Sequence, residues 1–322
     1  MKISSGLFAA AAMVLAFAGA GHAAYPERPI TLIVPWAAGG GTDAIGRMIA
    51  QGLQEELGQP VNVVNRTGAG GIVGHKEMID AEPDGYTLGF ATAELGTYQA
   101  MGTSEISPAD VTPIALMNFD AAAFSVRADS DWATLGDALA AIEKAPAGTY
   151  KASGFPVGAG YHLALAGLLT DNGIDPKVIA VVPSQGAAPG FQELVSGGVD
   201  IVPSSLPEAA PMLQSGLIRT LAVLAPERLA AYPDVPTAIE AVGTRSVGGS
   251  WRGVVGPAGL PQEITDRLEA ALHAVSQSDA YVEFMDGRGF GRQWLPGAEF
   301  ATFMQKAQES ATASIEKLGL GQ

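Results

Sequence analysis

Residues 30–43 read ITLIVPWAAGGGTD, an order that predicts a buried strand, a glycine-rich turn and the start of a helix. Ile30 to Val34 is apolar and β-branched, and neither the proline nor the glycines behind it can continue a strand. Thr42 is a good N-cap, and the apolar residues that follow recur on one helical face: Ile45, Met48, Ile49, Leu53 and Leu57. Because Gly58 and Pro60 stop this pattern, we predict a helix from Thr42 to Leu57.

The same order recurs further along the chain. Residues 61–64 predict a second strand, residues 65–71 a glycine-rich loop, residues 72–81 a short helix and residues 86–92 a third strand. Strands that alternate with helices imply parallel pairing, since a parallel connection needs a crossover of about a dozen residues. The sequence therefore predicts an α/β fold of mostly parallel sheets flanked by helices.

The length and the pattern together predict two hinged lobes. Lobe 1 is expected over residues 24–124, lobe 2 over residues 125–224, and a return to lobe 1 over residues 225–322. Lobe 2 is expected to hold helices at 135–145, 162–169 and 191–196, and strands at 150–153, 178–182, 199–202 and 220–224. Helices at 262–277 and 299–318 are expected in the return. Two crossings between lobes make a hinge that can close around a ligand.

The N-terminus predicts export. Lys2 precedes an apolar run from Leu7 to Ala20, and Gly21-His22-Ala23 offers the small residues that a signal peptidase requires. The run is shorter than the about 20 residues of a comfortable membrane span, and an uncleaved anchor is the alternative. We predict a signal peptide over residues 1–23, cleaved near Ala23, and a periplasmic protein.

Composition narrows the function further. The chain has no cysteine, which excludes disulfides, thiolate metal sites and cysteine nucleophiles. Its formal net charge of −15 makes it a poor partner for nucleic acid or for an anionic membrane surface. A small anionic ligand remains compatible with this charge, because local donors would hold it.

Five loops are placed to bind a ligand. In open α/β sheets ligands bind beyond the carboxyl ends of the strands, which is where these loops fall: residues 35–43, 65–71, 92–97, 154–162 and 183–189. In the first loop, Gly39, Gly40 and Gly41 let the backbone approach a ligand. The first-turn N–H groups of the next helix are free donors with a partial positive charge, which suits a carboxylate. The alternative is that these glycines only shape a tight turn.

Motifs for nucleotide binding and for catalysis are missing. Asp43 follows Thr42 where a Walker loop would need lysine, and the last glycine of residues 68–74 comes one residue too late for the dinucleotide fingerprint. The histidines show no metal-site spacing, and no serine lies in a G-x-S-x-G elbow.

Three residues each have two interpretations. Asp43 could act as a general base, although an acid in the first turn of a helix is more often a cap or a partner of the helix dipole. His162 opens a helix and could contact the ligand or be a hydrogen-bonded structural residue. Trp36 follows the first strand and could form a wall of the pocket or belong to the core.

An ordered set of motifs extends over nearly all of the mature chain. It comprises YPERPI (25–30), VPWAAGGGTD (34–43), NRTGAGG (65–71), PDGYTL (83–88), GAAP (186–189), SLP (205–207), LAV (221–223), PDVPT (233–237) and GPAGLP (256–261). Together these motifs closely resemble the TctC or Bug family, the substrate-binding subunits of tripartite tricarboxylate transporters.

The resemblance implies a two-lobed periplasmic binding fold of the type II-like class, with a carboxylate held between the lobes partly through ordered water. It also implies delivery of that ligand to membrane permease subunits driven by a cation gradient. Matching positions in the first lobe would bind the ligand through Ala38, Gly39, Gly40, Thr42, Asp43, Ala69, Gly70, Thr92 and Ala93. Matching positions in the second lobe would bind it through Ser153, Gly158, Ala159, His162, Gly186, Ala187 and Ser204.

Two positions depart from the family pattern. Ala159 supplies no hydroxyl where family members commonly place serine or threonine, and Ser204 stands where they often carry aspartate. An amino acid, whose ammonium group needs a nearby acid, is therefore less expected as ligand. We predict a monomeric binding protein without catalysis, cofactor or metal; a ligand-sensing periplasmic subunit and an exported hydrolase are the alternatives.

Overall fold

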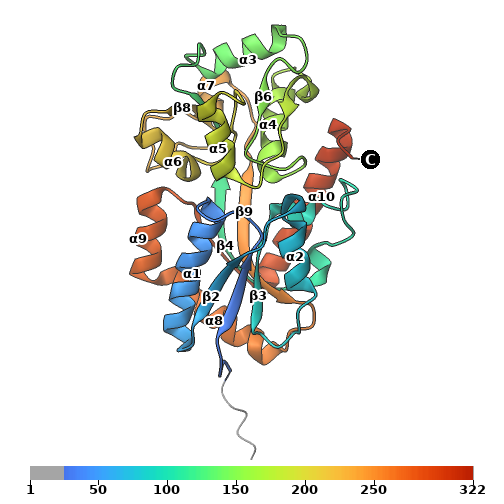
Figure 1. Ribbon diagram of the computed structural model, residues 1–322, viewed down its shortest axis with the longest axis vertical. Helices are drawn as coiled ribbons and strands as arrows, with labels where there is room; N and C mark the ends of the chain where they lie inside the picture. Colours follow the sequence, from blue (N-terminus) through green and yellow to red (C-terminus); the bar gives the residue numbers. More distant parts are fainter. Residues whose placement is uncertain (1–24, 322) are drawn as a thin grey trace, which may run out of the picture.

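The computed structural model describes residues 25–321, so the predicted signal peptide at residues 1–23 lies outside the described residues. Two lobes lie one above the other along the long axis of the molecule, and two long strands rise from the lower lobe to the junction (Figure 1). These strands are β4 (Val111–Ala121) and β9 (Gly249–Pro257). Over residues 25–321, no helix combines the length and the apolar character needed to cross a membrane.

The lower lobe is built on a six-stranded sheet with the order β10-β4-β9-β3-β1-β2. Its other strands are β1 (Ile30–Val34), β2 (Val61–Asn65), β3 (Thr87–Thr92) and β10 (Arg292–Pro296). β1 pairs in parallel with β2 and β3, whereas β9 runs antiparallel to β3 and β4, and β10 antiparallel to β4. Strands β1 to β4 therefore point the same way, which confirms the predicted α/β class with a mostly parallel sheet.

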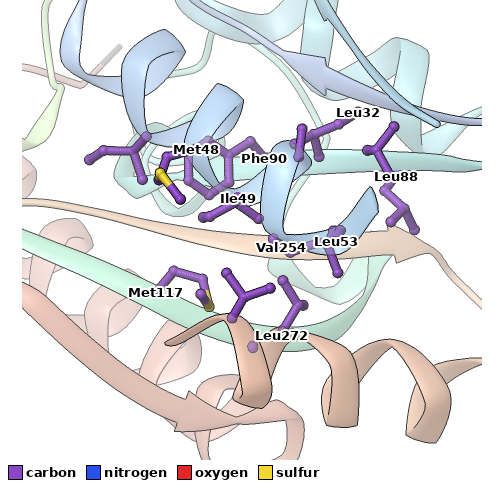
Figure 2. Packing of buried hydrophobic residues seen from close by; sticks show 14 of the residues in the cluster. Leu32, Met48, Ile49, Leu53, Leu88, Phe90, Met117, Val254 and Leu272 are labelled. Atoms are coloured by element: carbon purple, nitrogen blue, oxygen red, sulfur yellow. The ribbon is translucent and has the colours of Figure 1, made fainter. Parts of the chain in front are cut away.

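Helices cover both faces of this sheet. Leu32 and Val34 of β1 join one hydrophobic cluster with α1 (Gly41–Leu57), α8 (Gln262–Gln277) and α9 (Asp279–Arg288). Ile33 joins another with α2 (Ile72–Ile79) and α10 (Gly297–Leu318). Figure 2 shows the first cluster, where Ile49 and Leu53 of α1 lie over the sheet. Because β1 is buried on both faces, its sequence is a continuous apolar run instead of an alternating one.

The upper lobe contains two short strand pairs. β5 (Ala123–Arg127) pairs antiparallel with β8 (Ile218–Val223), and β6 (Lys151–Ala152) pairs parallel with β7 (Ala180–Val181). Ile201 and Val202 bridge the two pairs. The helices of this lobe are α3 (Leu135–Lys144), α4 (Gly160–Asp171), α5 (Ala187–Ser196), α6 (Leu206–Gln214) and α7 (Ala238–Val242).

The two crossings between the lobes lie side by side. Ala121 at the end of β4 is the register partner of Gly249 at the start of β9, and the Ala122 N–H donates to the Gly248 carbonyl at 2.8 Å. Residues up to Ala238 still pack in hydrophobic clusters of the upper lobe. We therefore propose that the chain returns to lobe 1 at Gly248, later than residue 225, and that the two paired crossings form the hinge.

The structure shifts the starts of four predicted helices, and α1 and α10 begin at Gly41 and Gly297 instead of residues 42 and 299. α5 begins at Ala187 instead of residue 191, and α4 at Gly160 instead of residue 162, so both begin closer to the junction of the lobes. The prediction of Thr42 as an N-cap is wrong, because Gly40 holds that position without a side-chain hydrogen bond. The Thr42 hydroxyl instead accepts a hydrogen bond from Nε of Arg252 at 2.8 Å.

Candidate functional site

A cavity lies between the two lobes, with walls from both. The lower lobe contributes Trp36, Ala37, Gly40, Gly41, Thr42, Glu94, Ser250 and Arg252. The upper lobe contributes Gly154, Phe155, Pro156, Tyr161, Gly186, Ala187, Ala188, Pro189 and Glu208.

Two helices that start at this cavity lack side-chain caps. The N-cap residues of α1 and α5 are Gly40 and Gly186, and neither position provides a capping side chain. Helices α3 and α7, which start elsewhere, carry complete capping boxes at Thr134 and Thr237. No capping side chain at Gly40 or Gly186 therefore competes for the first-turn N–H groups of α1 and α5, and the helix dipoles favour an anion there.

Arg252 is the cation of the cavity, and its side chain is only 2% exposed. Its Nη1 donates to the Asn118 amide oxygen at 2.6 Å and to the Asp120 carboxylate. Its Nη2 donates to the Glu208 carboxylate at 3.1 Å. With Thr42 at Nε, the guanidinium is held by four neighbours in fixed directions, which makes it a rigid recognition group for a carboxylate.

Glu208 joins the two lobes through its carboxylate. It lies in the first turn of α6 in the upper lobe, where its Oε2 accepts a hydrogen bond from the Ser205 hydroxyl at 3.1 Å. Its Oε1 accepts from the Gly41 N–H of α1, in the lower lobe, at 3.2 Å. A carboxylate of the protein thus already lies at the uncapped start of α1 and against Arg252.

Glu94 approaches the cavity from the lower lobe. It follows β3 in a short 3₁₀ helix (Ala93–Gly96), and its carboxylate accepts a hydrogen bond from the Thr92 hydroxyl. Burial raises the pKa of Glu94, while hydrogen bonds from Thr92 and from the Gly160 backbone at the start of α4 oppose that rise. Glu94 and Glu208 therefore each reach the N-terminus of a helix in the opposite lobe.

The Tyr161 hydroxyl is enclosed at the cavity beside Arg252 and Ser205, but it forms no hydrogen bond within the usual distance and angle limits. Burial raises its pKa well above the usual value, so the hydroxyl keeps its proton. It is therefore a buried donor available to a group in the cavity, and such donors are costly to leave unpaired.

The structure brings together part of the predicted set. Trp36, Gly40, Thr42, Gly186 and Ala187 line the cavity. Ala69 and Gly70 line a neighbouring recess, which shares Glu94 and Pro156 with the cavity. The remaining predicted residues lie outside the cavity lining: Ala38, Gly39, Asp43, Thr92, Ala93, Ser153, Gly158, Ala159, His162 and Ser204.

Trp36 and Thr92 hold the lower wall of the cavity. The Trp36 indole N–H donates to the Thr92 hydroxyl at 3.3 Å, and that hydroxyl donates in turn to Glu94. Thr92 therefore lies one residue away from the cavity and orients two residues that line it. The indole is 7% exposed and belongs to the lower hydrophobic cluster, so both interpretations of this tryptophan apply.

His162 supports the loop before α4. Its Nδ1 accepts a hydrogen bond from the Gly158 N–H at 2.9 Å, and its ring stacks on Phe155 with 5.3 Å between ring centroids. Burial lowers its pKa to about 4, so the ring is neutral near pH 7. The contacts therefore match the structural interpretation of this histidine.

Asp43 holds the glycine turn from below. Its carboxylate accepts hydrogen bonds from the Gly39 N–H at 3.0 Å, from Arg47 Nε and from the Asn65 amide. Burial raises the pKa of Asp43, but these hydrogen bonds outweigh it, and the pKa lies below its usual value. Asp43 therefore lies in the first turn of α1 as a partner of the helix dipole and anchors the turn before the helix, without capping it.

We expect Asp43→Ala to weaken carboxylate binding about fivefold, roughly 1 kcal/mol, because the turn that leads into α1 loses its anchor. Because the folded-state pKa is lowered, the stability that Asp43 contributes is present above the unfolded pKa of about 3.9 and is lost as the pH falls through the folded value. Melting temperatures of the two proteins should therefore converge below about pH 4. Unchanged affinity in calorimetry would remove this loop from the site.

Sequence reasoning missed the charged residues of the cavity. Arg252 had one local signal, a charge inside the apolar run WRGVVGP at residues 251–257, since charged residues are rarely buried without a partner. Glu208 had none, because an acid in the first turn of a helix is common. Among the described residues, no group of three or more acidic or histidine side chains could hold a metal ion.

The family of the chain follows from comparison with known proteins. Residues 45–320 match the model of the tripartite tricarboxylate transporter family receptor, TctC. The chain belongs to this family. Members of the TctC family are periplasmic solute-binding proteins. A similar relative, a UPF0065 protein of Bordetella pertussis, is 32% identical over 313 residues, covering 96% of this chain and 95% of that protein.

Two solved structures of family members resemble the chain over most of its length. A TctC solute binding protein from Polaromonas, solved with no ligand, is 32% identical with a TM-score of 0.67, covering 91% of this chain and 99% of that chain. MatC from Rhodopseudomonas palustris with bound malate is 27% identical with a TM-score of 0.80. The match covers 90% of this chain and 100% of that chain. The chain superposes better on the malate-bound structure despite the lower identity. In this chain, the hydrogen bond from the Gly41 N–H to Glu208 joins the two lobes directly.

Proposed function

We propose that this TctC-family protein is exported to the periplasm, closes its two lobes around a small carboxylate, and delivers that solute to the permease of a tripartite tricarboxylate-type transporter. The proposal includes no catalytic step. It is supported by the family, by the malate-bound relative and by the chemistry of the cavity.

One observation carries the choice of a carboxylate. The Glu208 carboxylate lies within hydrogen-bond distance of the Gly41 N–H and of Arg252, which come from the opposite lobe. The start of α5 offers a second set of free amides on the other wall, at Ala187 and Ala188. A carboxylate that reaches both walls stabilises the closed state relative to the open one, which is the condition for binding to drive closure.

The experiment is a thermal-shift and calorimetric screen of mono-, di- and tricarboxylates. A ligand that binds only the native state, present at a hundred times its Kd, should stabilise it by about 2.7 kcal/mol and raise the melting temperature. Gly40→Leu should abolish the shift, because Gly40 lines the cavity while a Cβ there meets only the Ala37 carbonyl at 3.5 Å.

The matched control is Gly287→Leu on the exposed face of α9, where a Cβ meets nothing within 4 Å. It should bind as the wild type does. Equal affinities of the Gly40 and Gly287 variants would place the carboxylate outside this cleft. Uptake by a deletion strain tests the permease: undiminished uptake of the bound solute, with loss of a transcriptional response to it, would indicate a sensing subunit instead.

A further inference from the structure

The cavity holds more acidic than basic side chains. Glu94 and Glu208 line it, and Asp120 lies directly behind Arg252. Arg252 is the only lysine or arginine among the lining residues that the structure describes. The side chains of Arg252 and Asp120 are 2% and 1% exposed, and both belong to the lower lobe. The positive charge of Arg252 is therefore matched within its own lobe before the lobes close.

Glu208 is then a surplus negative charge between the lobes, and Glu94, whose pKa burial raises, is a second acidic group in the same cavity. Glu208 accepts hydrogen bonds from Gly41, Ser205 and Arg252. Of these three, only Arg252 carries a full positive charge, and Arg252 also pairs with Asp120. A helix N-terminus supplies a partial charge of about half a unit. A solute with two carboxylates and no positive group would add two more negative charges to this enclosed space, and buried charges of one sign repel strongly.

We infer that the solute carries a protonated amine as well as a carboxylate, with the amine between Glu208 and Glu94 and the carboxylate at the free amides that open α5. The inference rests on the proposed function and narrows it to the class of small amino acids. An ammonium group supplies three donors, and both glutamates retain acceptor positions beyond the hydrogen bonds described above.

This changes one expectation from the sequence. The sequence makes an amino acid less expected as ligand, because Ser204 stands where family members often carry an acid. The structure supplies the acid from Glu208, one helical turn further along the chain, in the first turn of α6. Ser204 is fully buried, and its hydroxyl makes no hydrogen bond to protein.

The test compares solutes that differ only in an amine: succinate with aspartate, glutarate with glutamate, and butyrate with γ-aminobutyrate. Calorimetry on the mature protein at neutral pH should show the amine-bearing member of at least one pair binding at least tenfold tighter. In Glu208→Gln that preference should fall to threefold or less, while the amine-free member binds as before or more tightly. Glu94→Gln should reduce the preference in the same direction.

Glu193→Gln is the matched control, since Glu193 is exposed on α5 outside the cavity lining, and it should keep the wild-type preference. If the amine-free acids bind equally well or better in the wild type, the inference is overturned while carboxylate binding stands. If the preference survives in both glutamate variants, these residues are not the counter-charge and the inference is again overturned. If no member of any pair binds, the inference is overturned, and the wider screen of mono-, di- and tricarboxylates decides separately whether the proposed function stands.

Discussion

Replacing Arg252 with methionine is expected to destabilise the protein by about 3–5 kcal/mol, because Asp120 is left as a buried carboxylate without its cation. The two side chains are almost completely enclosed, and Arg252 also donates to Thr42 and Asn118. The melting temperature should fall by on the order of 10 °C, and solute affinity should fall because Glu208 loses its charged partner. Unfolding followed by circular dichroism measures the first effect and calorimetry the second.

Arg66→Met is the matched control. Arg66 pairs with Glu77 at 2.9 Å, but the two side chains are 46% and 44% exposed, and such surface pairs contribute about 0–1 kcal/mol. In the double variant Arg252→Met/Asp120→Asn, much of the lost stability should be recovered, because the buried carboxylate that Arg252→Met leaves unpaired is replaced by a neutral amide. Equal losses for Arg252→Met and Arg66→Met would contradict the assignment of a buried ion pair.

The pH dependence gives an independent check on the same pair. Burial raises the pKa of Asp120, and Arg252 together with hydrogen bonds from Gly291 and Asn118 opposes that rise. Without Arg252 the pKa rises further. A carboxyl whose folded-state pKa lies above its unfolded value of about 3.9 costs stability as the pH increases through the folded value. The deficit of Arg252→Met should therefore shrink as the pH is lowered toward about 4.

Gly190→Ala is expected to lower solute affinity at least tenfold, roughly 1.4 kcal/mol, although Gly190 does not line the cavity. A Cβ at this position would lie 2.5 Å from the Gly154 nitrogen and closer still to its Cα, and backbone atoms cannot rotate away. The first turn of α5 must then move away from the Gly154 loop, and both form the upper wall of the cavity. Overpacking of this kind also costs about 1–3 kcal/mol of stability.

Gly287→Ala is the matched control, because it makes the same glycine-to-alanine change in a helix without the steric clash. Gly287 also lies inside a helix, but a Cβ there meets nothing within 4 Å. Alanine has the higher helix propensity by about 1 kcal/mol, so this variant should be as stable as the wild type or more stable, with unchanged affinity. Wild-type affinity in Gly190→Ala would show that the spacing between α5 and Gly154 does not control the site.

The fold was accessible from the sequence because its signals are local. The apolar run of β1, the glycines before α1 and the spacing of Ile45, Ile49 and Leu53 are all contained in fewer than thirty consecutive residues. Errors arose where a distant residue competes for a local role: Thr42 would cap α1 in isolation, but Arg252 takes its hydroxyl. The sequence identified Asp43 and His162 as candidate site residues. It did not reveal that both side chains support loops, through Gly39 and Gly158.

The sequence by itself determined that strands and helices alternate, that glycine-rich loops end the first strands, and that the chain resembles the TctC family. Only the tertiary structure decided which charges meet in the cavity. Glu208 and Arg252 come from opposite lobes, and Glu94 reaches the same space from a third segment. Pairing across a cleft depends on how two lobes close, a property that no local pattern of residues encodes, and for this reason the charged centre of the site appeared only in three dimensions.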